Sequence, residues 1–195
     1  AGSIVLKVLA DGGIVAAPMG FPGGDLNRGE RGPSVLTTPR AHLKDADLLP
    51  FVEAMKAGAP MIHVGNVLVP TLDPSQAPAC VSAAVMRDLL RVELGYEGVI
   101  LAGPMDGEDI VRAMDASDAA KLALHSGADM ILWNSAGQRV VKTASELVLA
   151  IERGELSEET INDALRRVLQ LKLRYGLFTR PLPDPKRAER LEKDR

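Results

Sequence analysis

The sequence has few of the residues that build redox, metal or membrane-spanning structures. Cys80 is the one cysteine in 195 residues, which excludes an intramolecular disulfide and any site with several cysteine ligands. The three histidines show no metal-ligand spacing, so we predict neither a metal nor a cofactor. No run of residues reaches the roughly 18 apolar positions of a membrane span, and we expect no membrane partner.

Aromatic residues and one-sided charge are also scarce. Phe, Trp and Tyr make up 3% of the chain, few for a site that stacks rings on aromatic faces. The 23 basic and 26 acidic residues are interspersed and form no basic stripe, so nucleic acid is not an expected partner. The sequence opens Ala1-Gly2-Ser3 without a basic-then-apolar signal segment, and the default expectation is a cytoplasmic protein.

Strand-like and helix-like segments alternate along the chain. Strands are predicted at Gly13–Ala17, within Pro60–Val69, at Gly98–Ala102 and at Asp129–Trp133. Helices are predicted at Pro39–Lys56, Ser82–Gly95, Asp109–Leu124, Lys142–Ile151 and Glu158–Arg174, and Ile4–Leu9 is a short helical or buried apolar stretch. This order predicts an α/β fold of parallel β/α units with about four strands, half of a TIM-type (β/α)8 barrel. The half-barrel domain covers residues 1–178, and 179–195 is a charged, mobile tail.

Glycine-rich or polar residues follow the predicted strands. Met19–Asp25 reads MGFPGGD, Val99–Gly107 reads VILAGPMDG, and Asn66 and Asn134 come directly after two other strands. Because barrel sites lie at the carboxyl ends of the strands, Asp25, Asn66 and Asn134 are candidate substrate-binding residues. The alternative for Asp25 is a turn or capping residue, and for Asn66 a loop amide.

These stretches, with LLRVELGYEGVIL, AAKLALHSGADMIL and LRRVLQLKLRYGLF, resemble glycoside hydrolase family 3. The resemblance covers the second half of the catalytic barrel, from Ile14 to Phe178, and is strongest to the bacterial single-domain β-N-acetylglucosaminidases. It implies an O-glycosyl hydrolase scaffold and carbohydrate as the partner. The family's first half has no counterpart in this sequence.

The resemblance also implies that the catalytic motifs are degenerate. The family's aspartate nucleophile falls on Gly103, its Lys-His pair on Met19 and Gly20, and a further histidine on Asn66. Glycine has no side chain and cannot form the covalent intermediate of a retaining glycosidase.

The resemblance also identifies no clear general acid/base. The loop triplet that supplies it in the single-domain enzymes falls on residues 28–30, where only Glu30 is acidic. Asp25, Asp106 and Glu30 are therefore weak substitute candidates. The alternatives are a helix cap for Asp106 and a solvated loop for Glu30.

His63 and Trp133 could each contact a ligand, but each also has a structural interpretation. His63 alternates within an apolar strand, which favours a core or interface histidine over a ligand. Trp133 could stack on a sugar, although a packed core position is the commoner role.

Three hypotheses follow. The chain is a catalytically impaired family 3 relative that retains carbohydrate binding, or an active hydrolase completed by a partner half, or a structural half-barrel module. Four parallel strands cannot close a barrel. We therefore expect a homodimer or a chain supplying the other half, joined at Gly13–Ala17 and Asp129–Trp133, unless the sheet is rearranged into a flat one covered on both faces.

Overall fold

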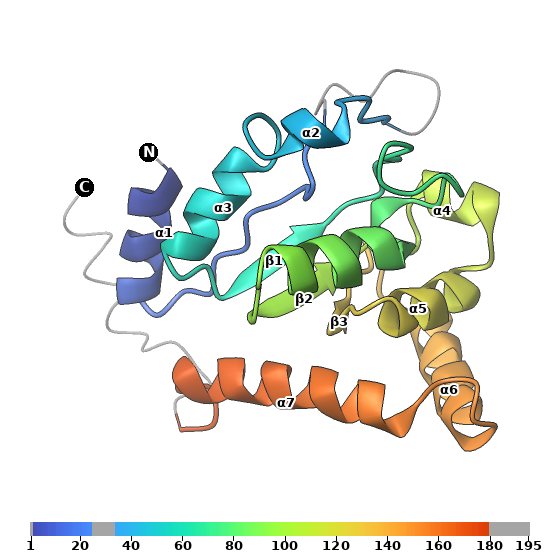
Figure 1. Cartoon of the computed structure of the whole chain (residues 1–195). Helices are drawn as coiled ribbons and strands as arrows, with labels where there is room; N and C mark the ends of the chain where they lie inside the picture. The colour runs from blue at the N-terminus through green and yellow to red at the C-terminus, as the bar shows by residue number, and fades with distance from the viewer. Residues whose placement is uncertain (1, 25–33, 180–195) are drawn as a thin grey trace.

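The computed structural model describes residues 2–24 and 34–179, a parallel sheet surrounded by helices (Figure 1). In chain order the elements are α1 (Gly2–Asp11), α2 (Arg40–Leu43), α3 (Leu49–Lys56), β1 (Met61–Val64), η1 (Ala79–Val81), η2 (Ala84–Glu93), β2 (Val99–Ala102), α4 (Glu108–Ala113), α5 (Ala116–His125), β3 (Met130–Ile131), α6 (Gln138–Glu152) and α7 (Glu158–Arg174). Within these ranges, no helix has both the length and the apolar character that a bilayer crossing requires.

The sheet confirms the predicted α/β half-barrel but contains fewer regular strands. Its order is β1-β2-β3, with both pairs parallel. The predicted strand at Gly13–Ala17 is wrong, because the chain joins the sheet only at residues 18–21. There the amide of His63 donates to the carbonyl of Pro18 (2.9 Å), and the amide of Phe21 donates to the carbonyl of His63 (3.0 Å). Pro18 has no amide to donate, which limits regular pairing at this edge.

Local capping explains where the predicted helices divide or begin. The predicted helix at Asp109–Leu124 is two helices, because the carboxylate of Asp115 accepts from the amide of Ser117 (2.8 Å) and begins α5. Pro39–Lys56 is likewise divided into α2 and α3, with Pro50 in the first turn of α3. Ser157 caps α7 as predicted, and Ser82 accepts from the amide of Val85 at the start of η2, which has π-helical winding.

The two faces of the sheet are buried unequally. Ile62 and Ile100 lie in register, as do Val64 and Ala102, and all four are fully buried against residues of α3, η2 and α5. On the opposite face Leu101 is only partly buried, although Val99 and His63 on that face are buried. A half-barrel has this asymmetry, because its outer face is covered by helices and its inner face is open where the other half would stand.

A buried ionic cluster joins four elements near the amino ends of the strands. The side chain of Asp129 is fully buried just before β3 and forms ion pairs with Arg91 of η2 and Arg167 of α7. One of its oxygens also accepts from the amide of Ile100 in β2 (2.8 Å). Arg91 in turn donates to the carbonyl of Tyr96 (2.7 Å) before β2. The cluster therefore fixes two helices to two strands.

His63 of β1 holds together the opposite, carboxyl ends of the strands. Its Nδ1 accepts from the amide of Gly20 (3.3 Å), so its Nε2 carries the proton and donates to the carbonyl of Gly103 (2.9 Å). Burial lowers the pKa of this imidazole, against a smaller opposing effect of the hydrogen bond to Gly103. The prediction of a satisfied core histidine is confirmed.

This burial makes stability depend on pH. In the unfolded chain His63 takes up a proton below about pH 6.5, whereas in the folded chain it stays neutral to a lower pH. The unfolded state therefore binds more protons in this window, and the free energy of unfolding should fall as the pH drops from about 6.5 toward 5. Urea unfolding across this range measures the slope. His63→Gln should flatten it, whereas exposed His42→Gln should leave it unchanged; equal slopes in all three proteins would contradict the assignment.

The ionic cluster predicts a large cost for removing its one carboxylate. Asp129→Asn leaves two arginines facing each other without a counter-charge, and we expect a loss of about 3–5 kcal/mol in unfolding free energy. The matched control is Asp163→Asn, which breaks an exposed pair with Arg166 and should cost no more than about 1 kcal/mol. Thermal and urea unfolding of both variants measure the difference, and equal costs would refute the structural role of the cluster.

Candidate active site at the carboxyl ends of the strands

The loops that follow β1, β2 and β3 meet on one side of the sheet, where the sequence places its candidate residues. Asn66, Gly103, Asp106 and Asn134 all lie in these loops. Asp25 and Glu30 lie outside the described residues, as does the rest of the predicted acid/base triplet.

Gly103, at the position of the family's nucleophile, has a backbone that a side chain does not fit. Its φ is +133°, a region open to glycine and strained for other residues. A Cβ there would lie 2.8 Å from the carbonyl oxygen of Leu132 and 3.0 Å from the amide of Met105. The amide of Gly103 donates to the carbonyl of Val64 (3.2 Å), and its carbonyl accepts from His63. The residue is held on both sides and faces no space for a carboxylate.

Asn66 is fixed through only one end of its amide. Its Nδ2 donates to the carbonyl of Pro104 (3.1 Å), which orients the side chain toward the loop after β2. Its Oδ1 is buried and has no hydrogen-bond partner among residues 2–24 and 34–179. A buried carbonyl oxygen without a donor is unfavourable, so this acceptor calls for an explanation.

Asp106 connects the loops after β2 and β3. The alternative that it caps the following helix is wrong, because α4 has no side-chain cap. One carboxylate oxygen accepts from the amide of Asn134 (2.7 Å), and the other accepts from the amide and hydroxyl of Ser135 (3.0 and 2.7 Å). Burial acts to raise the pKa of Asp106, but these hydrogen bonds outweigh it and hold the pKa below its usual value. The group is thus a fixed carboxylate and a poor proton donor. The side chain of Asn134 is exposed beside it.

The glycine-rich stretch before Asp25 serves mainly as scaffold. Phe21 is fully buried and packs edge-on against Phe51, with ring centroids 5.2 Å apart. Met19, at the position of the family's lysine, is 70% exposed, and Gly20 donates to His63. In the described ranges, no group of three or more His, Cys, Asp or Glu side chains is arranged to hold a metal ion.

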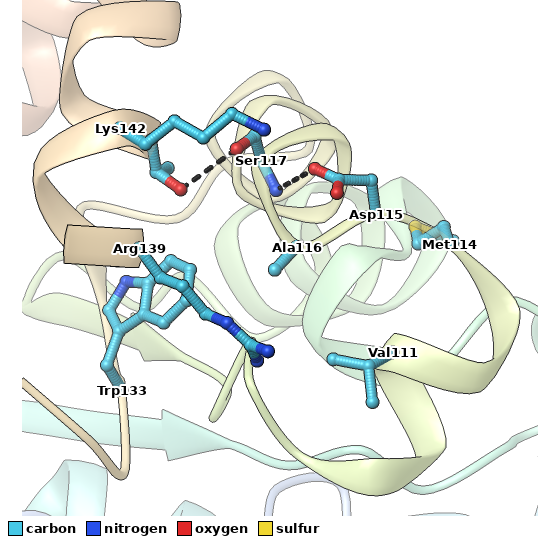
Figure 2. Close-up of a pocket in the computed structure, with 9 residues that line it drawn as sticks. Val111, Met114, Asp115, Ala116, Ser117, Trp133, Arg139 and Lys142 are labelled. Carbon is cyan, nitrogen blue, oxygen red and sulfur yellow. Dashed lines mark hydrogen bonds between the residues drawn. The ribbon is translucent and has the colours of Figure 1, made fainter. Parts of the chain in front are cut away.

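A separate pocket of about 260 Å³ lies beyond the end of β3 (Figure 2). It is lined by Val111, Met114, Asp115, Ala116, Ser117, Trp133, Arg139, Lys142 and Thr143. Trp133 lines this pocket and also packs against the main core, the commoner of the two roles expected for it. Sequence analysis missed the other members, because α4, α5 and α6 bring them together only in the fold.

Comparison with known proteins agrees with this arrangement. The model of the glycosyl hydrolase family 3 N-terminal domain matches residues 2–171. β-Hexosaminidase A of Pseudoalteromonas piscicida is 30% identical over 186 residues, covering 86% of this chain and 31% of that protein. The solved family 3 β-N-acetylglucosaminidase of Paenibacillus sp. FPU-7 is 30% identical with a TM-score of 0.87, covering 93% of this chain and 35% of that one.

A more distant structure shares the fold alone. The β-N-acetylglucosaminidase of Thermotoga maritima is 22% identical with a TM-score of 0.76, covering 87% of this chain and 37% of that chain. The chain thus spans about a third of the length of these relatives. From the match of the family model over most of its length, the chain belongs to glycoside hydrolase family 3 and represents part of the family's N-terminal barrel domain.

Proposed function

We propose that this is a catalytically impaired family 3 domain that retains carbohydrate binding at the carboxyl ends of its strands. The observation that carries the proposal is Gly103. A glycine stands where the family places its nucleophile, and its backbone and neighbours leave no room for a side chain.

The remaining carboxylates do not compensate within the described residues. Retaining hydrolysis uses two carboxyl groups about 5–5.5 Å apart, one as nucleophile and one as acid/base. Asp106 has both oxygens engaged by the loop after β3 and stays ionised, which suits neither an attacking group free to move nor a proton donor. Glu108, the first residue of α4, forms an exposed ion pair with Arg112.

Binding is a separate property that needs no nucleophile. The unpartnered Oδ1 of Asn66 offers an acceptor for a sugar hydroxyl or acetamido N–H, and the exposed Asn134 side chain offers a second amide. The relatives named above are a β-hexosaminidase and β-N-acetylglucosaminidases. The expected ligand class is therefore a β-linked N-acetylhexosamine.

The first test is hydrolysis of an aryl β-N-acetylglucosaminide. We expect no turnover above the uncatalysed rate, and Gly103→Asp alone should not restore activity. That variant should also lose about 1–3 kcal/mol of unfolding free energy through backbone strain, as should the control Gly103→Ala. Turnover by the unaltered chain in the ordinary range of about 1–10³ per second would overturn the proposal.

A second candidate function, a half-barrel assembly module, is favoured by the surface of α7. Leu165, Leu169 and Leu173 recur at intervals of four residues along an open groove that ends at Phe178, and all four are exposed. Leu173 is 69% exposed. The sheet is also open at β3, and its inner face is only partly buried at Leu101. Long apolar surfaces beside an open sheet edge favour pairing with further β/α units.

This candidate predicts self-association. A second copy of the chain would supply four more strand segments, joining β3 of one copy to residues 18–21 of the other. Light scattering at micromolar concentration should then give about twice the 20.8 kDa of one chain. Leu173→Glu should shift the particle toward one chain, whereas Val92→Glu, which charges an equally exposed position on η2, should not. A strictly monomeric particle would reject self-pairing.

A further inference from the structure

The pocket beside Trp133 is built from groups that the proposed function does not use. It lies on the carboxyl-end side of the sheet, because Trp133 closely follows β3 and Ser117 stands in the first turn of α5. Asn66, Gly103 and Asn134 do not line it. It is thus distinct from the position where the family cleaves its substrate.

The residues that line the pocket carry more positive than negative charge. Arg139 and Lys142 come from the first turns of α6, and Asp115 is the one acidic lining residue. In the part of the chain that the structure describes, Arg139 has no ion pair or side-chain hydrogen bond, whereas Lys142 reaches only the half-exposed Glu146 at 3.4 Å. Figure 2 shows the guanidinium of Arg139 extending into the space between Trp133 and Val111.

Asp115 remains ionised and offsets one of these two positive charges, so the wall keeps one unbalanced positive charge. The carboxylate of Asp115 is already occupied as the cap of α5, where it accepts from the amide of Ser117 at 2.8 Å. That hydrogen bond, with a smaller contribution from the charge of Lys142, lowers the pKa of Asp115 despite some opposing desolvation. The free positive group is the guanidinium of Arg139, whose planar donors suit a carboxylate or phosphate.

The other walls suit a sugar ring. Trp133, Val111 and Met114 provide an apolar side with one indole N–H donor. Across the pocket the buried hydroxyls of Ser117 and Thr143 lie 2.9 Å apart and can hydrogen bond with ring hydroxyls. The volume of about 260 Å³ is just below the roughly 300 Å³ at which drug-sized pockets begin, a size that suits a single sugar ring.

We propose that this pocket binds one anionic monosaccharide unit, with its carboxylate or phosphate at Arg139 and Lys142 and its ring against Trp133. The site is separate from the cleavage position. It rests on the proposed function only in that the ligand is a carbohydrate.

The test uses a probe that the protein already contains. The sequence contains one tryptophan, so the tryptophan fluorescence comes entirely from a residue that lines this pocket. The protein is titrated with glucuronate, glucose 6-phosphate, glucose and inorganic phosphate. We expect a saturable change with glucuronate, glucose 6-phosphate or both, and a much weaker one with glucose. A response to only one anionic sugar identifies the carboxylate or the phosphate as the recognised group.

Matched charge variants complete the test. Arg139→Gln should weaken binding of the anionic sugar about ten- to a hundredfold, as expected when a charged hydrogen bond is lost. Arg112→Gln removes an equally exposed arginine that does not line the pocket and should bind as the unaltered chain does. Equal binding by Arg139→Gln, an equal response to glucose, or phosphate binding as tightly as glucose 6-phosphate would overturn the proposal. Because none of these readouts involves hydrolysis, its failure is distinguishable from failure of the proposed function.

Discussion

The buried carboxylate of Asp129 is the interaction on which the arrangement of the strands and helices depends. It lies just before β3, and its two arginine partners come from η2 and α7, so one charge positions elements from three parts of the chain. The amide of Ile100 completes its hydrogen bonding from β2. Buried charges are costly unless each is paired, and here the pairing is possible only when η2, β2, β3 and α7 are all in place. The cluster therefore selects this packing over others that would bury the same apolar surface.

Different kinds of interaction hold the loops and helices at the two ends of the sheet. At the amino ends the restraint is the charge cluster around Asp129. At the carboxyl ends it consists of single side chains that bond to loop backbone: His63 to Gly20 and Gly103, Asn66 to Pro104, and Asp106 to the loop after β3. Such contacts fix the loops on the carboxyl side, where barrel enzymes carry their sites.

Sequence patterns predicted the elements well where local rules decide them. The helix at Glu158–Arg174, with Ser157 as its cap, has the predicted bounds, and β2 lies within the predicted strand. The errors arose where a single residue overrides periodicity: Asp115 begins a new helix inside an apolar pattern, and Pro18 delays entry into the sheet. Tertiary partners were not predictable. Arg91 and Arg167 each lie 38 residues from Asp129, and no local pattern relates them.

The candidate site was likewise predictable from the sequence only in part. The resemblance drew attention to Gly103 from the sequence, but only the structure shows the conformation of its backbone. The positive φ and the nearby carbonyl of Leu132 show that the loop conformation itself suits glycine. Gly103 is also connected to the core, because His63 hydrogen bonds to the carbonyl of this same residue. A side chain at residue 103 would require the neighbouring backbone to shift, because its Cβ would lie 2.8 Å from the carbonyl oxygen of Leu132. The histidine and the glycine therefore constrain each other, and the loop is held in a conformation that suits glycine at residue 103.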